Sequence, residues 1–186
     1  MLKFAALLAT LGLSACATHS AEGPVLNPKV GGAQMYPSKT ILANLSASGD
    51  HDKLIAAVTA SGLVDVLNGP GPFTLFAPTD AAFDALPDKG YAGLMTPDNK
   101  GRLSHIFDCS MVTGITSLAQ LETLVVDHQG SYQLDTIGGC PVTAHLAADG
   151  GLILVSDAGA VAHVTTPDIN QENGVVHVID AVLVPR

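Results

Sequence analysis

The stretch of residues 72–87, PFTLFAPTDAAFDALP, constrains the fold more than any other part of the chain. Its first half, residues 73–77, is a short apolar run rich in strand-forming side chains, and Pro78 ends it because proline cannot donate to a sheet. Thr79 or Asp80 can cap a following helix by accepting a hydrogen bond from a free backbone N–H. The stretch therefore predicts a buried strand, a turn and a short capped helix.

A second informative stretch, residues 173–185, reads NGVVHVIDAVLVP and lies about a hundred residues further along. Its Asn-Gly pair is a strong signal for a hairpin turn, and the valines and isoleucine that follow are strand formers. We therefore expect a second buried strand here, preceded by a tight turn at Asn173-Gly174.

Together, FTLFAPTDAAF and NGVVHVIDAVLVP resemble the two signature motifs of the fasciclin domain family, one near each end of the fold. The resemblance covers residues 39–186 and implies a single α+β domain, with N-terminal helices packed on a twisted β-sandwich of short strands. It also implies binding or adhesion, although a fold alone does not establish a function.

The order of the remaining elements agrees with an α+β domain, because helices come first and strands follow. We expect helices at residues 40–47, 52–60 and 97–107, with shorter helical turns at 63–67 and 91–95. Gly-rich and Asp-rich turns separate the expected strands, which are residues 132–137, 141–147, 152–156, 161–165 and 175–178.

The N-terminus carries targeting information. Residues 1–15 have the basic start, short apolar run and small-residue end of a signal peptide, and Leu13-Ser14-Ala15-Cys16 resembles a bacterial lipobox. We expect Cys16 to be acylated and residues 16–38 to form a flexible tether. This predicts a lipid-anchored protein of the bacterial envelope, with the outer membrane favoured, in a periplasmic or surface-exposed position. The alternative is an ordinary secretory signal that leaves a free Cys16.

Composition excludes some partners. With 47% hydrophobic residues the chain can bury a sizeable core, and a net charge of −9 with only eight Lys and Arg leaves no basic surface for nucleic acid. The partners we expect are the membrane, through the lipid, and an unknown protein or glycan.

Two further cysteines, Cys109 and Cys140, form an even pair in a chain expected to be exported, which favours a disulfide. On the chain-entropy model such a bridge stabilises the domain by roughly 3–4 kcal/mol. The alternative is two buried thiols.

The sequence motifs do not indicate catalysis or metal binding. No GxSxG, GxGxxG or GxxxxGK[ST] pattern occurs, and no two of the seven histidines share a metal-ligand spacing. We therefore expect no enzyme activity, cofactor or metal. His51 lies beside an expected helix start, so we expect it to be solvated. His177 alternates with valines on an expected strand, which favours a surface or hydrogen-bonded histidine. Asp80 lies at the start of its own helix, and we expect it to cap that helix.

The fasciclin resemblance points to two positions. The family's Tyr-His pair matches Ser104-His105 here, and it implies that His105 hydrogen-bonds a neighbouring core segment, with surface recognition as the alternative. The family's Pro-Asp-Ile matches Pro167 with Asp168 and Ile169, a pair that animal relatives use in integrin adhesion. The alternative is a fixed loop in which Asp168 satisfies backbone N–H groups and Ile169 packs inward.

These observations predict a non-catalytic envelope lipoprotein that serves adhesion or protein and glycan binding. Two alternatives remain open: an envelope-structural interaction protein, and a small-molecule-binding or enzymatic domain with an apolar pocket.

Overall fold

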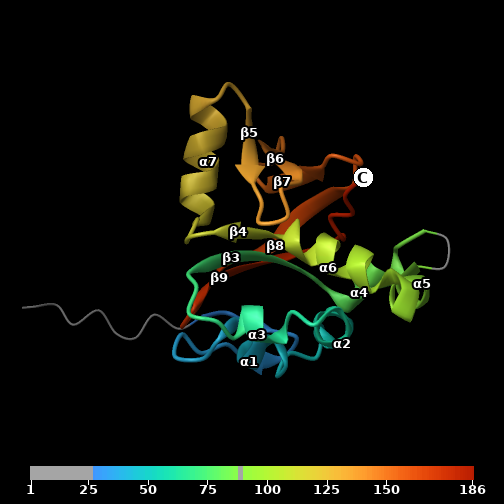
Figure 1. Cartoon of the computed structure of the whole chain (residues 1–186). Coiled ribbons are helices and arrows are strands. Elements are labelled where there is room, and N and C mark those ends of the chain that lie inside the picture. Colours follow the sequence, from blue (N-terminus) through green and yellow to red (C-terminus); the bar gives the residue numbers. More distant parts are fainter. Residues whose placement is uncertain (1–26, 88–89) are drawn as a thin grey trace, which may run out of the picture.

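The computed structural model describes residues 27–87 and 90–186 (Figure 1). Short helices dominate the first half of this part of the chain, and strands dominate the second half, which confirms the predicted α+β fold. None of its helices combines the length and apolarity needed to cross a bilayer. The helices are α1 (Ile41–Leu45), α2 (Asp52–Ser61), α3 (Val64–Leu67), α4 (Asp80–Asp84), α5 (Gly90–Leu94), the 3-10 turn η1 (Pro97–Asn99), α6 (Lys100–Asp108) and α7 (Leu118–Asp127).

One mixed sheet of seven strands forms the centre of the described region, in the order β4-β3-β9-β8-β7-β6-β5. Only β3 and β9 run parallel, and every other neighbouring pair is antiparallel. Its strands are β3 (Phe73–Pro78), β4 (Met111–Thr113), β5 (Ser131–Asp135), β6 (Pro141–Leu146), β7 (Leu152–Ser156), β8 (Val161–Gln171) and β9 (Gly174–Ile179).

The two stretches that the sequence singles out are direct neighbours in the sheet. β3 and β9 pair from Phe73 with Gly174 to Pro78 with Ile179. Every residue of β9 is buried, because the strand lies between β3 and β8 and is covered on both faces. The parallel pair is therefore the centre of the fold.

The turn before β9 differs from the prediction. Gln171 pairs with Gly174, so the turning residues are Glu172 and Asn173 rather than Asn173-Gly174. Gly174 is needed for a close approach, since a side chain there would collide with the carbonyl oxygen of Phe73. Asn173 is buried and ties the helices down: its Oδ1 accepts from the Ile41 N–H, and its Nδ2 donates to the Leu67 and Gly69 carbonyls.

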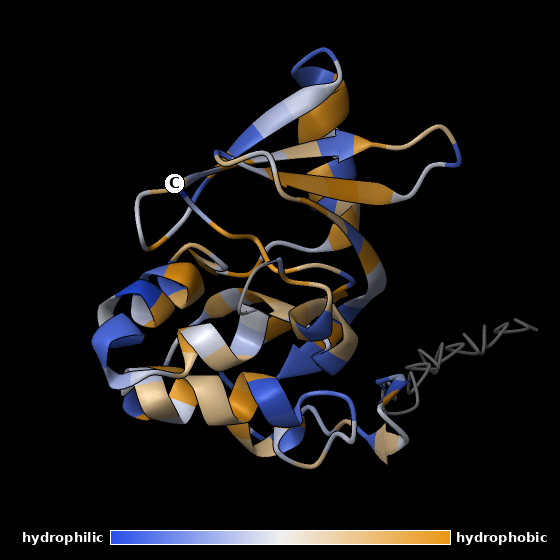
Figure 2. Cartoon of the chain, turned by 90° about the vertical axis from the view of Figure 1, so that its right-hand side faces the viewer, coloured by the Kyte–Doolittle hydropathy of each residue, from blue (hydrophilic) through white to orange (hydrophobic). Residues whose placement is uncertain are grey.

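The sheet separates two hydrophobic cores. The larger core, on one side, joins α1–α6 to residues of β3, β8 and β9, and includes Leu54, Leu75, Phe83 and Ile106. The smaller core joins α7 to β5, β6 and β7, and includes Phe76, Leu121 and Leu154. Figure 1 shows α7 beside β5, β6 and β7, away from α1, α2 and α3 below β3 and β9. The helices in Figure 2 are striped with polar and apolar residues, as amphipathic packing requires.

The two edges of the sheet meet. Val112 in β4 forms an isolated bridge with Thr136 just after β5, and the Ile137 N–H donates to the Met111 carbonyl over 2.8 Å. The sheet therefore curves almost into a closed barrel. We call this contact the β4–β5 seam.

Part of the predicted tether belongs to the domain. Residues 27–38 of the expected tether 16–38 contain the small hairpin of β1 (Lys29–Val30) and β2 (Ala33–Gln34), and Met35 is fully buried. Asn27 exchanges hydrogen bonds with the backbone of Asn170. The prediction is wrong for these residues because their few apolar side chains are anchored by contacts far along the chain. Residues 1–26, with Cys16 and the expected signal peptide 1–15, lie outside the described residues.

Of the two candidate caps for α4, Thr79 is confirmed and Asp80 is wrong. Thr79 caps α4 by accepting from the Ala82 N–H. Asp80 instead accepts from the Lys53 N–H at the start of α2, and Asp84 pairs with the Lys53 ammonium. Asp80, at the N-terminus of α4, thus caps α2 and not its own helix.

Candidate functional site

The Asp168-Ile169 pair lies where β8 is irregular, at the second of two shifts in its register with β9, between Thr166 and Ile169. Asp168 has a left-handed backbone (φ 55°), which orients its carboxylate toward the start of α7, where Oδ1 accepts from the Leu118 N–H over 2.8 Å. Ile169 is fully buried in the larger core. This is the arrangement of the fixed loop, and a binding role for the pair stays a prediction.

His177 lies directly beneath this loop and is fully buried. Its Nδ1 accepts from the Asp168 N–H and its Nε2 lies 2.9 Å from the Thr116 carbonyl, an arrangement that requires a neutral ring with its proton on Nε2. The ring stacks on Phe76, with ring centroids 5.6 Å apart. Burial lowers the pKa of His177, against the opposing effects of the Thr116 carbonyl and Asp168. Of the two predicted environments, the hydrogen-bonded one is observed.

Asp168 and His177 together fix the position of α7 from its N-terminal end. Asp168 holds the first turn of the helix, and His177 holds the connection from β4 through Thr116. Ser117 adds a capping box with Gln120, in which each side chain accepts from the other residue's backbone N–H. The segment from β4 into α7 is therefore held in one conformation by groups of β8 and β9.

A shallow groove of about 530 Å³ runs along this fixed segment, and we call it the α7 groove. Ile115 at one end is 57% exposed and presents a large apolar side chain beside the groove. A second hollow of about 480 Å³ continues from it between β4 and β5, sharing Thr116 and Leu124. The lining of the α7 groove is uncharged and consists of Ile115, Thr116, Ala119, Gln120, Thr123 and Leu124.

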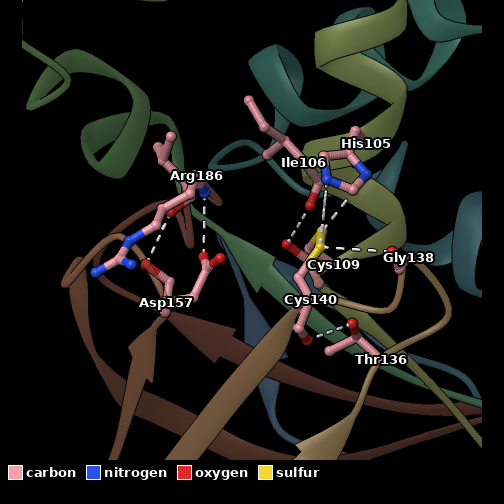
Figure 3. The surroundings of a disulfide bond; sticks show 11 residues. His105, Ile106, Cys109, Thr136, Gly138, Cys140, Asp157 and Arg186 are labelled. Carbon is pink, nitrogen blue, oxygen red and sulfur yellow. Dashed lines mark hydrogen bonds between the residues drawn. A yellow bond between two sulfur atoms is a disulfide. The ribbon is translucent and has the colours of Figure 1, made fainter.

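Cys109 and Cys140 form a disulfide, as predicted, with their Cα atoms 5.4 Å apart (Figure 3). Cys109 is the residue that ends α6, and Cys140 directly precedes β6. Cys140 is also held by its backbone, because its carbonyl accepts from the Thr136 hydroxyl over 2.7 Å. The bridge therefore crosslinks the chain at the β4–β5 seam.

His105 is not in the environment that the family resemblance implies. Its side chain is exposed, although its neighbours Ile106 and Phe107 are buried. The recorded polar contacts of its ring are with sulfur: Nε2 lies 3.5 Å from Cys140 Sγ and 3.8 Å from Cys109 Sγ (Figure 3). The expected hydrogen bond to a core segment is absent from the described contacts, because this face of α6 turns toward the disulfide.

One set of metal-ligating atoms in the described residues was not anticipated. One ring nitrogen of His105 and the sulfurs of Cys109 and Cys140 all lie within 4.8 Å of one another. The four-residue separation of His105 and Cys109 on a helix was a usable signal, but Cys140 is 31 residues from Cys109 and only the fold brings it near.

His51 was predicted to be solvated and is instead fully buried. Its Nδ1 lies 2.9 Å from the Ser48 hydroxyl, and its Nε2 has no hydrogen-bond partner among the described residues. Burial lowers the pKa of His51, and the nearby Asp50 and Asp80 oppose this shift. The prediction failed because α2 and the segment before it pack against the β3–α4 connection.

A separate cavity of about 370 Å³ lies among α4, α5 and α6. Asn99 and Arg102 are the polar side chains that reach it, so it combines an apolar wall with one guanidinium. Its other lining residues are Leu86, Pro87, Gly90, Gly93, Leu94, Ile106 and Val184.

Comparison with known proteins places this geometry in a family. The model of the fasciclin domain matches residues 49–185. Protein sll1483 of Synechocystis is 31% identical over 94% of this chain and 89% of its own length, and the cell surface glycolipoprotein MPT83 of Mycobacterium tuberculosis is 31% identical over 91% and 70%. Human stabilin-1 is 25% identical over 80% of this chain, which corresponds to 5% of that much longer protein.

The fold also matches a solved structure, the FAS1 domain pair of the insect cell adhesion molecule fasciclin I. The TM-score is 0.67 at 22% identity, over 78% of this chain and about half of the domain pair. The two motifs that form the parallel β3–β9 pair, the matched family model and the shared fold agree: this chain is a bacterial member of the fasciclin domain family.

Proposed function

We propose that this protein is a non-catalytic adhesion domain, held at the bacterial cell surface by a lipid on Cys16, which binds a protein partner through the α7 groove. Family membership supports adhesion, because proteins named for cell adhesion or for the cell surface are among its relatives. The names of those relatives also support display outside the cell, and the lipobox of this chain supports the anchor.

The exposed Ile115 on a rigid segment carries the assignment of the groove. Exposed apolar surface rimmed by polar groups marks interaction sites in soluble domains, and a preformed site avoids the entropy cost of ordering on binding. The hydrogen bonds that Asp168 and His177 make to the β4–α7 segment provide this preorganisation. In this proposal Asp168 acts by holding the groove and Ile169 by anchoring the loop, rather than by touching the partner.

Attachment of whole cells tests this proposal. The parent bacterium, its deletion strain and strains carrying single variants would be applied to envelope material prepared from the same species. We expect deletion and Ile115→Asp to reduce attachment to the same low level. Val161→Asp is the matched control, because Val161 is also an exposed β-branched apolar residue but lies on β8 away from the groove. Equal attachment by wild type and Ile115→Asp would contradict the groove assignment.

Treatment of the coated material identifies the class of partner. Loss of attachment after protease digestion is expected, whereas loss after periodate oxidation alone would show that the partner is a glycan. A Cys16→Ser variant should leave the membrane fraction and appear in the medium, and its retention in the membrane would contradict the lipid anchor. Attachment that survives deletion, combined with weakened envelope integrity, would support the envelope-structural role instead.

The cavity among α4, α5 and α6 supports a second function, the binding of a small apolar carboxylate. Arg102 places a guanidinium, with Asn99 as the second polar side chain, beside a mainly apolar wall, and this combination orients a carboxylate over a hydrophobic tail. Titration with a fluorescent fatty acid would test this function. Saturable binding that is weakened by Arg102→Ala but not by Lys100→Ala, which removes another cation of α6, is the expected result.

A further inference from the structure

The disulfide has a third metal-ligating side chain, His105, beside its two sulfurs. His105 and Cys109 lie one turn apart on the same face of α6, and Cys140 faces them from the connection between β5 and β6 (Figure 3). The Nε2 atom of His105 is 3.5 Å from Cys140 Sγ. A pair of ligands separated by four residues on a helix, completed by a third ligand from elsewhere, is a recurrent way to build a zinc site.

The chemistry of these three side chains selects a thiophilic cation. Two thiolates and one neutral imidazole form a Cys₂His set, which suits Zn²⁺ with Zn–S distances near 2.3 Å and Zn–N distances near 2.0 Å. Two sulfurs bound to one tetrahedral ion lie roughly 3.7 Å apart. Rotation of the two side chains can reach that separation, because the Cα atoms are 5.4 Å apart. Three protein ligands leave a fourth position, and the exposed side of His105 opens it to water.

We propose that reduction of the Cys109–Cys140 disulfide converts this crosslink into a Zn²⁺ site with Cys109, Cys140 and His105 as ligands. Two molecules of an external thiol supply two electrons and two protons. They leave as their own disulfide, and Cys109 and Cys140 become thiols. Binding of Zn²⁺ then forms two Zn–S bonds and one Zn–N bond, and the two thiol protons go to solvent. No net oxidation occurs in the second step.

The location of the site indicates what the metal would do. Both crosslinks join the end of α6 to the turn before β6, beside the β4–β5 seam. In the oxidised protein the disulfide holds this contact, and in the reduced protein Zn²⁺ would hold the same elements through the same two sulfurs. The inference is independent of the adhesive function proposed above.

Titration of the purified chain with Co²⁺ tests the site, because Co²⁺ occupies zinc sites and gives thiolate-to-metal charge-transfer absorption. The protein would be reduced with a phosphine in the absence of oxygen. We expect one equivalent of Co²⁺ to produce the thiolate band, one equivalent of Zn²⁺ to abolish it, and the oxidised protein to give no band. A reduced protein that gives no thiolate band overturns the proposal.

A variant of His105 tests its contribution to Zn²⁺ affinity separately from that of the cysteines. His105→Ala leaves the disulfide and the buried neighbours of the histidine in place, so the oxidised variant folds and can then be reduced. We expect it to bind Zn²⁺ more weakly by a larger factor than the roughly 10–100-fold that follows the loss of an outer-shell partner. His128→Ala is the control, because His128 is an exposed histidine at the end of α7 that takes no part in this cluster. Equal affinities of His105→Ala and His128→Ala would remove His105 from the site.

Thermal unfolding supplies a second readout. Reduction should lower the midpoint of unfolding, and Zn²⁺ should restore part of the loss in the reduced wild type, because a ligand that binds only the folded state stabilises it. Zn²⁺ should restore nothing in Cys109→Ser/Cys140→Ser. A midpoint that Zn²⁺ raises equally in both proteins would place the bound metal elsewhere and overturn the proposal.

Discussion

The two cores of this domain are stabilised in different ways. In the larger core, side chains from distant parts of the sequence hold the N-terminal ends of α1 and α2: Asn173 binds the Ile41 N–H, and Asp80 binds the Lys53 N–H. In the smaller core, α7 is a ten-residue helix with its own capping box. It packs on β5 and β6 and is held by neighbours mainly at its first turn, through Asp168. The larger core therefore joins α1–α6, whereas α7 depends on its own interface with the strands of the smaller core.

Truncation of one large side chain in each core should show this difference most strongly. Phe83→Ala removes a fully buried ring from the larger core and should lower the free energy of unfolding by about 3–5 kcal/mol. Leu121→Ala removes the fully buried anchor of α7 and should cost about 2–5 kcal/mol.

Hydrogen exchange measured on both variants separates the two mechanisms. Phe83→Ala should reduce protection throughout the domain, and Leu121→Ala should first reduce protection in α7. A uniform loss of protection in Leu121→Ala would show that the two cores unfold as one unit.

A smaller effect is expected from Asn173→Ala, which tests the polar attachments of the larger core. The substitution leaves the Ile41 N–H and the Leu67 and Gly69 carbonyls without the side chain that binds them, which should cost about 1–3 kcal/mol. Asn170→Ala is the matched control, because its exposed side chain makes a single recorded contact, with the Asp168 carbonyl. Denaturant unfolding should place the control within roughly 0.5 kcal/mol of wild type. Equal losses in the two variants would contradict the role of Asn173.

The smallest effect is expected on mild acidification, and it distinguishes the two buried histidines. Burial lowers the folded-state pKa of both His51 and His177 below the ordinary value of 6.5. The unfolded chain then binds protons that the folded chain rejects, so stability is fully present above about pH 6.5 and falls as pH drops toward the folded-state pKa. Linkage limits the loss between pH 7 and 6 to roughly 0.7 kcal/mol for each histidine.

Variants assign this pH dependence. His51→Gln and His177→Gln should each flatten the fall in denaturant stability between pH 7 and 5, relative to wild type. His177→Gln should also increase hydrogen exchange at the start of α7, because His177 binds the Thr116 carbonyl and the Asp168 N–H. His51→Gln should leave that region unchanged. An unaltered pH profile in both variants would show that neither histidine remains neutral through burial.

Sequence patterns predicted several elements closely. The helices at 40–47 and 52–60 correspond to α1 with its Thr40 cap and to α2, which ends at a left-handed Gly62. The strand at 152–156 is β7. Signals for α7 were also present and were not used: Ser117 and Gln120 form the spacing of a capping box, and Leu118, Leu121 and Val125 recur at helical spacing. Helix α7 was not predicted, although the pattern that indicates this helix is local.

By itself the sequence determined the α+β class, the two motif strands, the helix caps that act on their own helix and the pairing of two cysteines. The strands and caps depend on residues a few positions apart. The cysteine pairing follows from the count, because only Cys109 and Cys140 remain once Cys16 is expected to carry the lipid. Only the tertiary structure decided that His51 and His177 are buried, that Asp80 caps α2 and Asp168 caps α7, and that His105 lies against the sulfurs. Such contacts join residues that are far apart in the sequence. Whether a side chain is buried or hydrogen-bonded depends on which distant segments pack against it, and local sequence patterns do not contain that information.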